Sequence, residues 1–279
     1  MLTNSPSPAE LPPAAANVPA DEPHGTPDRT DGTVETRRES NGRWIATQLV
    51  TIRNGYGDAT QASLEADTFN GAIRTLGFDG GGYLLEASLY AHGATETEAR
   101  ERLAELELQH SDEKTGPQLT LTTELVVPDP TCSIEWICPS VATQGDRGAT
   151  LLYALPQRAS HGLGLDTSNG AILVQDLQGS TLQADTSNGA ISMDGAWDSV
   201  DLSSSNGRIT AKVATGKDTG YDIEASTSNG QITLDVDDTQ SVGEQTNNQK
   251  HVRTNGYDDR DHRIGLSIDT SNSSVTVTG

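Results

Sequence analysis

The sequence predicts an all-β protein: a β-solenoid of the single-stranded parallel β-helix type, with one packed amphipathic helix and a disordered N-terminal tail. Three observations support this class. A short motif centred on Asn-Gly recurs along the chain, aromatic residues make up only 4% of the 279 residues, and brief runs of alternating apolar and polar residues are common. A core of small aliphatic side chains suits thin layers of strands better than a bulky α/β enzyme.

Residues 1–42 are expected to form the disordered tail. Prolines interrupt this stretch repeatedly, and Ala, Asp and Thr fill much of the remainder, so it has little apolar surface to bury. Ordered structure is expected to begin near Trp44, where aliphatic and β-branched residues become frequent.

Residues 43–160 are expected to form an N-terminal β part that is continuous with the solenoid and contains one helix, at about 95–108. Thr95 and Glu98 have the spacing of a capping box, which marks the start of a helix. The apolar stripe of this helix comprises Ala99, Leu103 and Leu106. Alternation typical of strands then follows at Leu119, Leu121 and Thr123, and again at Leu151, Tyr153 and Leu155.

The two cysteines, Cys132 and Cys138, fall with Ile134 and Trp136 on one face of a predicted strand. At ~3.3 Å per residue a straight strand separates them by about 20 Å, which is too far for a disulfide. Buried free thiols and a disulfide across a turn both remain open. Two cysteines alone do not make a zinc site.

Residues 161–279 are expected to form the solenoid repeats, with a polar insertion at about 237–263. Segments such as Asp166–Ile172 and Asp185–Ile191 have the same sequence, Asp-Thr-Ser-Asn-Gly-Ala-Ile, and looser copies recur. Each copy is centred on an asparagine: Asn70, Asn169, Asn188, Asn206, Asn229 and Asn272. A unit of about 20 residues cannot bury its apolar face alone, so the units must stack.

The residues around each asparagine follow the same pattern of residue types in every copy. An aliphatic residue stands six positions before it, Leu, Ala or Ile stands four before, Thr or Ser stands two before, and Ile or Val stands three after. Period-two alternation therefore places these residues, and the asparagine itself, on the inner face. Asn-Gly is expected to turn the corner through left-handed dihedral angles, and the buried asparagines are expected to form a hydrogen-bonded ladder.

The charge balance excludes several partners. The chain has 40 Asp and Glu against 18 Lys and Arg, a net charge of −22, which disfavours nucleic acid and anionic membrane surfaces. Such acidity resembles the surfaces of proteins from halophilic organisms. No segment has the apolar length of a membrane span.

No catalytic, cofactor-binding or metal-binding residues are expected. Four aspartates stand three positions before a corner asparagine and face outward: Asp67, Asp166, Asp185 and Asp269. They are expected to form a solvated acidic face, with a bound cation as the alternative. His161 is expected to be exposed, and the cluster of Asp258, Asp259, Asp261 and His262 is expected to lie in a flexible loop.

From Trp44 to Gly279 the chain resembles the putative-adhesin, β-strand-repeat family of bacterial and archaeal proteins of unknown function. The resemblance rests on the lone helix, on Leu155-Pro156 before the repeats, and on the Ser-Asn-Gly-x-Ile signature at Ser168–Ile172. It implies a solenoid-like β fold with an adhesive or envelope role and no established active site.

The predicted function is therefore a non-catalytic, adhesin-like surface or interaction module with an unknown protein or cell-surface partner. The alternatives are a cytosolic self-assembling scaffold like the bactofilins and a carbohydrate-active β-helix enzyme. The compartment stays open: cell envelope or extracellular if a leader has been removed, otherwise cytoplasmic. Self-association through the C-terminal coil is also expected, because Val275 and Val277 complete an apolar strand at the end of the chain.

Overall fold

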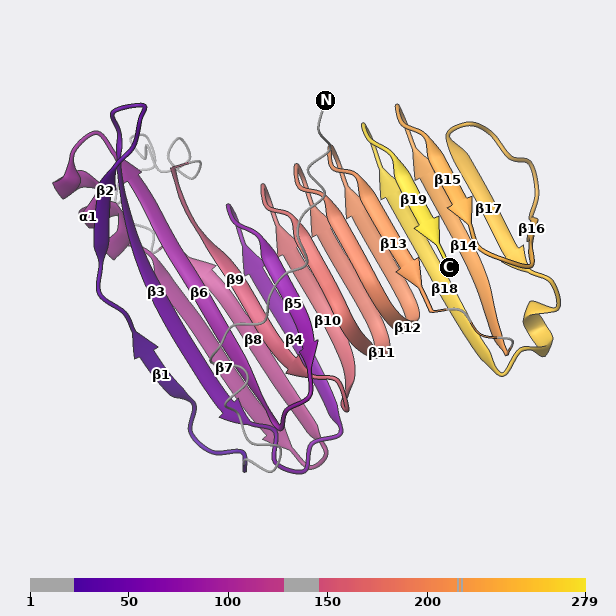
Figure 1. Cartoon of the computed structure of the whole chain (residues 1–279), viewed down its shortest axis with the longest axis horizontal. Coiled ribbons are helices and arrows are strands. Elements are labelled where there is room, and N and C mark those ends of the chain that lie inside the picture. The colour runs from indigo at the N-terminus through magenta and orange to yellow at the C-terminus, as the bar shows by residue number, and fades with distance from the viewer. Residues whose placement is uncertain (1–22, 128–145, 215, 217) are drawn as a thin grey trace, which may run out of the picture.

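Strands dominate the computed structural model of the chain, which describes residues 23–127, 146–214, 216 and 218–279 (Figure 1). The described part contains one α-helix. The predicted all-β class is confirmed. The strand that was predicted to carry Cys132 and Cys138 lies outside the described residues.

The first half of the chain contains β1 (Asp28–Asp31), β2 (Glu35–Arg38), β3 (Trp44–Gly55), β4 (Gln61–Thr68), β5 (Ile73–Phe78), β6 (Gly82–Gly93), α1 (Glu96–Ala104), β7 (Glu107–Thr115) and β8 (Gln118–Val126). The second half contains β9 (Arg147–Pro156), β10 (Ser160–Thr167), β11 (Ile172–Thr186), β12 (Ile191–Ser204), β13 (Ile209–Val213), β14 (Thr219–Thr227), β15 (Ile232–Asp235), β16 (Thr239–Ser241), β17 (Gln249–Thr254), the 3₁₀ turn η4 (Tyr257–Asp259), β18 (His262–Thr270) and β19 (Val275–Thr278).

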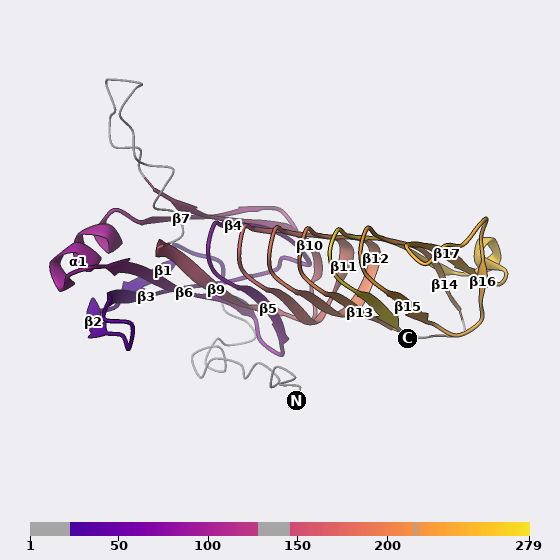
Figure 2. The same cartoon turned by 90° about the horizontal axis from the view of Figure 1, so that it is seen from above.

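These strands form one mixed sheet that folds into two layers facing each other across the core (Figure 2). Layer A contains, in spatial order, β7, β8, β4, β10, the second halves of β11 and β12, and then β18, β14, β17 and β16. Layer B contains β1 and β2 beside β3, followed by β6, β9, β5, the first halves of β11 and β12, and then β13, β19 and β15. Within each layer the central strands are parallel. Antiparallel strands flank them at both ends of layer A and at the β3 end of layer B.

Alternation along each strand fills the core between the layers. The aliphatic residue six positions before each corner asparagine is at most 3% exposed in every copy: Leu64, Leu163, Leu182, Val200, Ile223 and Leu266. The Ile or Val three positions after it is at most 2% exposed. Parallel strands stacked in register place like residues side by side, so each set forms a continuous apolar row.

The helix α1 is shorter than predicted and ends at Ala104. Its N-terminus has the predicted cap, because the Thr95 hydroxyl accepts a hydrogen bond of 3.1 Å from the backbone N–H of Glu98. Ala99 and Leu103 are buried, whereas Leu106 lies beyond the helix and is only partly buried. The helix lies at the end of the molecule away from the C-terminal strands (Figure 1).

The prediction that order begins near Trp44 is wrong. β1 and β2 both pair antiparallel with β3, and both consist of charged and polar residues. Their order comes from the neighbouring strand, which supplies backbone partners whatever the side chains are. A composition-based expectation misses this contribution.

The predicted open C-terminal coil is also wrong. β18 lies between β12 and β14, and β19 lies between β13 and β15, so the last unit of the sequence sits inside the stack. Val275 and Val277 are fully buried rather than facing an open end. The end of layer A is formed instead by the polar insertion, in which β17 pairs antiparallel with β14 and β16 pairs with β17.

The position of β18 between β12 and β14 leads to a prediction. In a chain that ends at Asp261, β14 loses its parallel neighbour over the whole of Thr219–Thr227. We expect amide hydrogen exchange to show loss of protection in β14 and β17, while β4 and β10 at the other end stay protected. Unchanged protection in β14 would contradict the observed strand order.

Candidate functional site

The turns between the two layers lie in one row, at the upper edge of the molecule in Figure 1. At each turn the chain passes from layer A to layer B through the motif, which is Asn-Gly in five copies and Asn272-Ser273 in the sixth. Because the units are stacked in register, equivalent residues of successive turns are neighbours in space.

The corner asparagines are joined by side-chain hydrogen bonds. In each pair the Nδ2 of one asparagine donates to the Oδ1 of the next, with distances of 2.6 Å for Asn169 to Asn70, 2.7 Å for Asn188 to Asn169, 2.8 Å for Asn206 to Asn188, 2.8 Å for Asn272 to Asn206 and 2.9 Å for Asn229 to Asn272. Asn70 Nδ2 donates in turn to the carbonyl of Arg147, at 3.0 Å.

The asparagines lie differently from the expectation. Only Asn70 is buried, and Asn169, Asn188, Asn206, Asn229 and Asn272 are exposed. Period-two alternation ends at the Thr or Ser two positions earlier, where the strand ends and the turn begins, so it does not continue to the asparagine. None of these asparagines, nor the glycine that follows, has a positive φ, so left-handed geometry is not the reason for the motif.

The buried hydroxyl two positions before each asparagine fixes the corner. Thr186 Oγ1 donates to the carbonyl of Gly170 in the adjacent unit at 3.0 Å and accepts from the N–H of Gly189 at 3.1 Å. The equivalent hydroxyls that donate across to an adjacent unit belong to Thr68, Thr167, Ser204, Thr227 and Thr270. The sequence shows that this position is always Thr or Ser, but its hydrogen-bonding role was not predicted.

The motif glycines are required by close approach. A Cβ added at Gly170 would lie 1.7 Å from the carbonyl oxygen of Gly71, and one added at Gly189 would lie 1.7 Å from that of Gly170. At Gly207 and Gly230 the corresponding distance is 1.6 Å. A side chain at any of these positions would push the units apart, which would break the hydrogen bonds on both sides.

The outer face of layer A carries two parallel rows of mostly polar and acidic side chains. The row three positions before the corner contains, in spatial order, Glu124, Asp67, Asp166, Asp185, Ser203, Asp269, Ser226 and Gln249. The row five positions before contains Thr122, Glu65, Gly164, Gln183, Asp201, Ser267, Glu224 and His251. We call this surface the acidic face.

The carboxylates of the acidic face repel one another. Burial, together with the neighbouring Asp166 and Glu124, raises the pKa of Asp67. The pKa of Asp166 is raised by burial and by Asp185, and that of Asp201 is raised by burial and by Asp185 and Asp269. A shallow hollow of about 440 Å³ lies among Glu65, Asp67, Glu124, Asp166 and Asp185.

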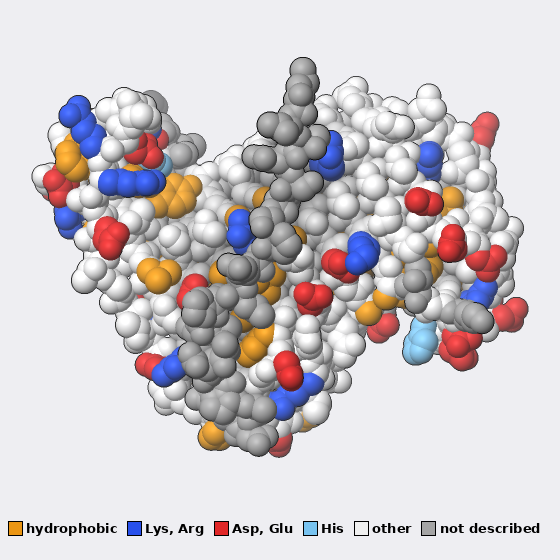
Figure 3. All heavy atoms as spheres, in the orientation of Figure 1, with side chains coloured by type: hydrophobic (Ala, Val, Ile, Leu, Met, Phe, Trp, Pro, Cys, Tyr) orange, Lys and Arg blue, Asp and Glu red, His pale blue; other side chains and the backbone are white. Residues whose placement is uncertain are grey.

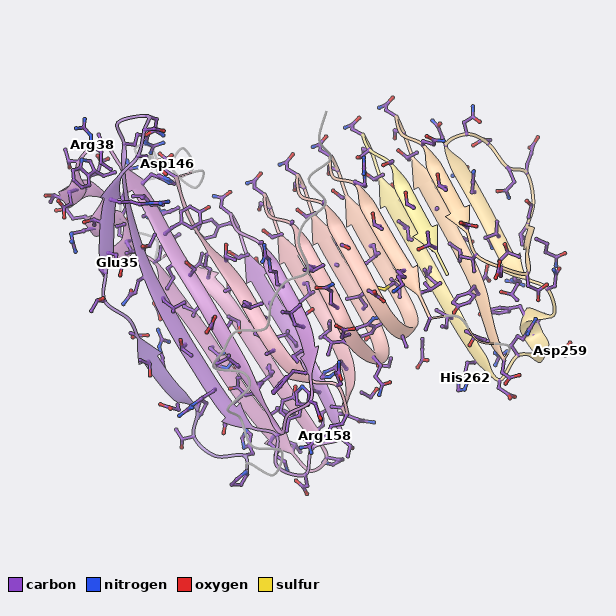
Figure 4. All side chains as sticks on the ribbon, viewed as in Figure 1. Glu35, Arg38, Asp146, Arg158, Asp259 and His262 are labelled. Carbon is purple, nitrogen blue, oxygen red and sulfur yellow. The ribbon has the colours of Figure 1, made fainter. Side chains whose placement is uncertain are left out.

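Among the described residues, no three His, Cys, Asp or Glu side chains converge as metal ligands do. Asp259 and His262 lie at the end of the molecule opposite Glu35 and Asp146 (Figure 4). His161 is 1% exposed rather than exposed as predicted, and its Nε2 lies 2.9 Å from the carbonyl oxygen of Pro156. Burial lowers the pKa of His161. None of the described helices has the length and apolar character needed to cross a bilayer.

Comparison with known proteins finds a similar fold. No protein-family model and no curated protein sequence matches the chain. A solved structure described as a putative cell adhesion protein from Clostridium sporogenes is similar with a TM-score of 0.56 and 12% identity, over 91% of this chain and 99% of that one. A putative adhesin from Bacteroides fragilis aligns with a TM-score of 0.30 and 12% identity, over 82% of this chain and 96% of that one. At this identity the first likeness shows a shared fold.

The corner hydroxyl generates a prediction. Thr186→Val removes the partner of two buried backbone groups and should lower the free energy of unfolding by ~1–3 kcal/mol. Asn188→Leu should cost less, about 0.5–1.5 kcal/mol, because water can reach the amides left at this exposed corner. Denaturant unfolding compares the loss of unfolding free energy in the two variants. A larger loss for Asn188→Leu than for Thr186→Val would contradict the role assigned to Thr186.

The close approach of Gly189 to Gly170 leads to a second prediction. Gly189→Ala should destabilise the fold by at least ~1–3 kcal/mol, because the added methyl group overlaps the carbonyl of Gly170. Gly265→Ala is the matched control, because a Cβ at Gly265 meets nothing within 4 Å. Thermal melting should separate the two variants, and equal melting temperatures would contradict the close-approach argument.

The acidic face generates a prediction on pH and salt. Folding raises the pKa of Asp166, so its charge opposes folding above the folded pKa, and this cost disappears as the pH falls below the unfolded value. Asp166→Asn should therefore raise the melting temperature at pH 7 in dilute buffer, by on the order of 1 °C. The gain should shrink in molar salt, which screens the repulsion from Asp185 but not the cost of burial, and it should vanish at acidic pH. Asp79→Asn, away from the row, should show no such gain.

Proposed function

We propose that the chain is a non-catalytic, adhesin-like surface or interaction module built from a repetitive β-solenoid, and that the acidic face is its contact surface. The supporting observation is the continuity of this face. The register of the parallel strands aligns its rows from β8 to β14 without a break.

The side chains of this face favour contact with another macromolecule. Their spacing is set by the register of the strands, and the Asp and Ser side chains among them are short, so these lose little side-chain entropy when a partner covers them. Carboxylates dominate, so the partner surface is expected to carry Lys, Arg or another cationic group. Rows of this kind suit an extended partner better than a small molecule, because the described hollow among them is shallow.

The described residues that most resemble a catalytic group support a structural role instead. Tyr83 Oη lies 2.7 Å from Asp112 Oδ2 and 2.9 Å from His110 Nε2. Tyr83 is fully buried, and burial lowers the pKa of His110 to about 4, so the imidazole is neutral at pH 7. His110 Nδ1 and the Thr123 hydroxyl are 2.8 Å apart, so both ring nitrogens have partners inside the protein.

The similar structure from Clostridium sporogenes adds support, because that protein is described as a putative cell adhesion protein. The self-assembling scaffold is supported less well, because β17 and β16 cover the end of layer A where a second copy would stack. A carbohydrate-active enzyme would need exposed aromatic platforms, whereas Trp197 is 2% exposed.

The test uses the full chain attached to fluorescent beads. We expect the beads to adhere to cells of the organism that encodes the chain, and Asp67→Asn with Asp166→Asn to reduce adhesion several-fold. The matched control is Asp79→Asn with Asp235→Asn, which removes equal charge away from the acidic face and should leave adhesion unchanged. Equal loss in both variants would indicate a general charge effect and would overturn the assignment of the surface. Absence of adhesion by the unmodified chain would overturn the proposed function.

A further inference from the structure

The strand β7 has one hydrogen-bonding edge that no described strand occupies. Within the described part of the chain it pairs with β8 alone, so it forms one end of layer A (Figure 2). The hairpin that joins the two strands has a two-residue loop, which is flanked by the register partners Thr115 and Gln118. In such a hairpin the flanking residues form a hydrogen-bonded pair, and every second residue then directs its backbone groups away from the partner strand.

The residues of β7 that direct their backbone groups away from β8 are Leu108, His110, Asp112 and Lys114. Arg29 supports this assignment, because its Nη1 donates to the carbonyl of Leu108 at 3.1 Å. For the other three residues, no hydrogen bond from a described residue reaches these backbone groups. The edge is therefore open from His110 to Lys114.

The exposure of Asp112 shows that solvent reaches this edge. Its side chain is only 4% exposed, because it points into the protein and accepts a hydrogen bond from Tyr83, yet the residue as a whole is partly exposed. The accessible area therefore belongs to the backbone. Leu121, its register partner on β8, has a strand on each side and is fully buried.

The outer side chains along β7 are polar or acidic. Those exposed on the outer face are Glu107, Gln109, Ser111, Glu113 and Thr115. Gln109 is the register partner of Glu124, so a strand added at the edge would continue the rows of the acidic face. A Lys or Arg opposite Gln109 would lie two strand spacings, about 10 Å, from Glu124.

The basic side chains near the edge do not offset this charge. Arg29 is paired with Asp31, and Lys114 is paired with Asp58. On the face formed by layer B, by contrast, Lys and Arg are interspersed with Asp and Glu (Figure 3). A basic segment is therefore attracted to the layer A side of the molecule, whereas a second copy, with its own net charge of −22, is repelled.

We propose that the free edge of β7 binds an extended basic segment of a partner protein, which pairs antiparallel with residues 110–114. Backbone hydrogen bonds hold the segment, and its alternate Lys or Arg residues lie on the same face as Glu107 and Glu113. The antiparallel direction continues the pairing of β7 with β8 and is the more stable of the two per residue. This inference rests on the proposed function, because the positive charge of the partner follows from the acidic face.

The experiment uses the full chain and a seven-residue peptide in which threonine and lysine alternate. We expect the bound peptide to slow amide hydrogen exchange, measured by NMR, several-fold at His110, Asp112 and Lys114. The amides of Ser111 and Glu113 face β8 and should not change. Binding that slows none of the first three amides would overturn the strand addition and leave the acidic face as a contact surface, which the bead assay tests separately. Absence of binding would also overturn the strand addition.

Two modified peptides of equal charge separate backbone pairing from charge attraction. N-methylation of two threonines removes N–H groups that would point to β7, so it should abolish the slowed exchange. N-methylation of two lysines alters N–H groups that would point away from β7, so the slowed exchange should remain. Equal effects of the two modifications would overturn the proposal.

A variant of the chain tests the position of the segment. Glu113→Lys should weaken peptide binding several-fold, whereas the control Glu101→Lys, which makes the same change of charge on α1, should not. Equal weakening would indicate general charge attraction and would overturn the proposal. If exchange at His110, Asp112 and Lys114 is already slow in the free chain and slows further as its concentration rises, a second copy occupies the edge and the proposal is wrong.

Discussion

The contact between stacked glycines at the corners is the constraint on which the rest of the structure depends. With no Cβ, the backbone of Gly189 lies against the carbonyl of Gly170, and the Thr186 hydroxyl bonds to that same carbonyl. These contacts hold successive units in register. Register in turn aligns the apolar residues into continuous rows inside and the acidic residues into continuous rows outside.

The sequence predicted the parts of this arrangement that follow from local alternation. Leu182 and Ile191 are buried because strand geometry alternates whatever the strand pairs with. The helix cap at Thr95 was predictable for the same reason, since its hydrogen bond lies within four residues. The burial of Asn188 was predicted wrongly, because alternation was extended past the end of the strand into a turn.

Features that depend on neighbours in space were not predictable from the residues. The Asn272 copy of the motif is compatible with any place in the stack, so the sequence could not place it between Asn206 and Asn229. Similarly, β1 consists of charged residues and is ordered by pairing with β3. The acidic row was identified as outward-facing from sequence, but the raised pKa of Asp67 depends on burial and on Asp166 and Glu124, which belong to strands far away in the chain.

The internal position of β18 has a consequence for biosynthesis. A ribosome makes the chain from the N-terminus, so β14 emerges before the strand that separates it from β12 exists. Until the residues of β18 leave the ribosome, the edges of β12 and β14 are complementary to a segment that is still missing. Pairing β12 directly with β14 would be a trap, because it would leave the last unit without a place. Completion of the stack therefore waits until β18 has been synthesised, and it depends on contacts that are distant in sequence, which form slowly.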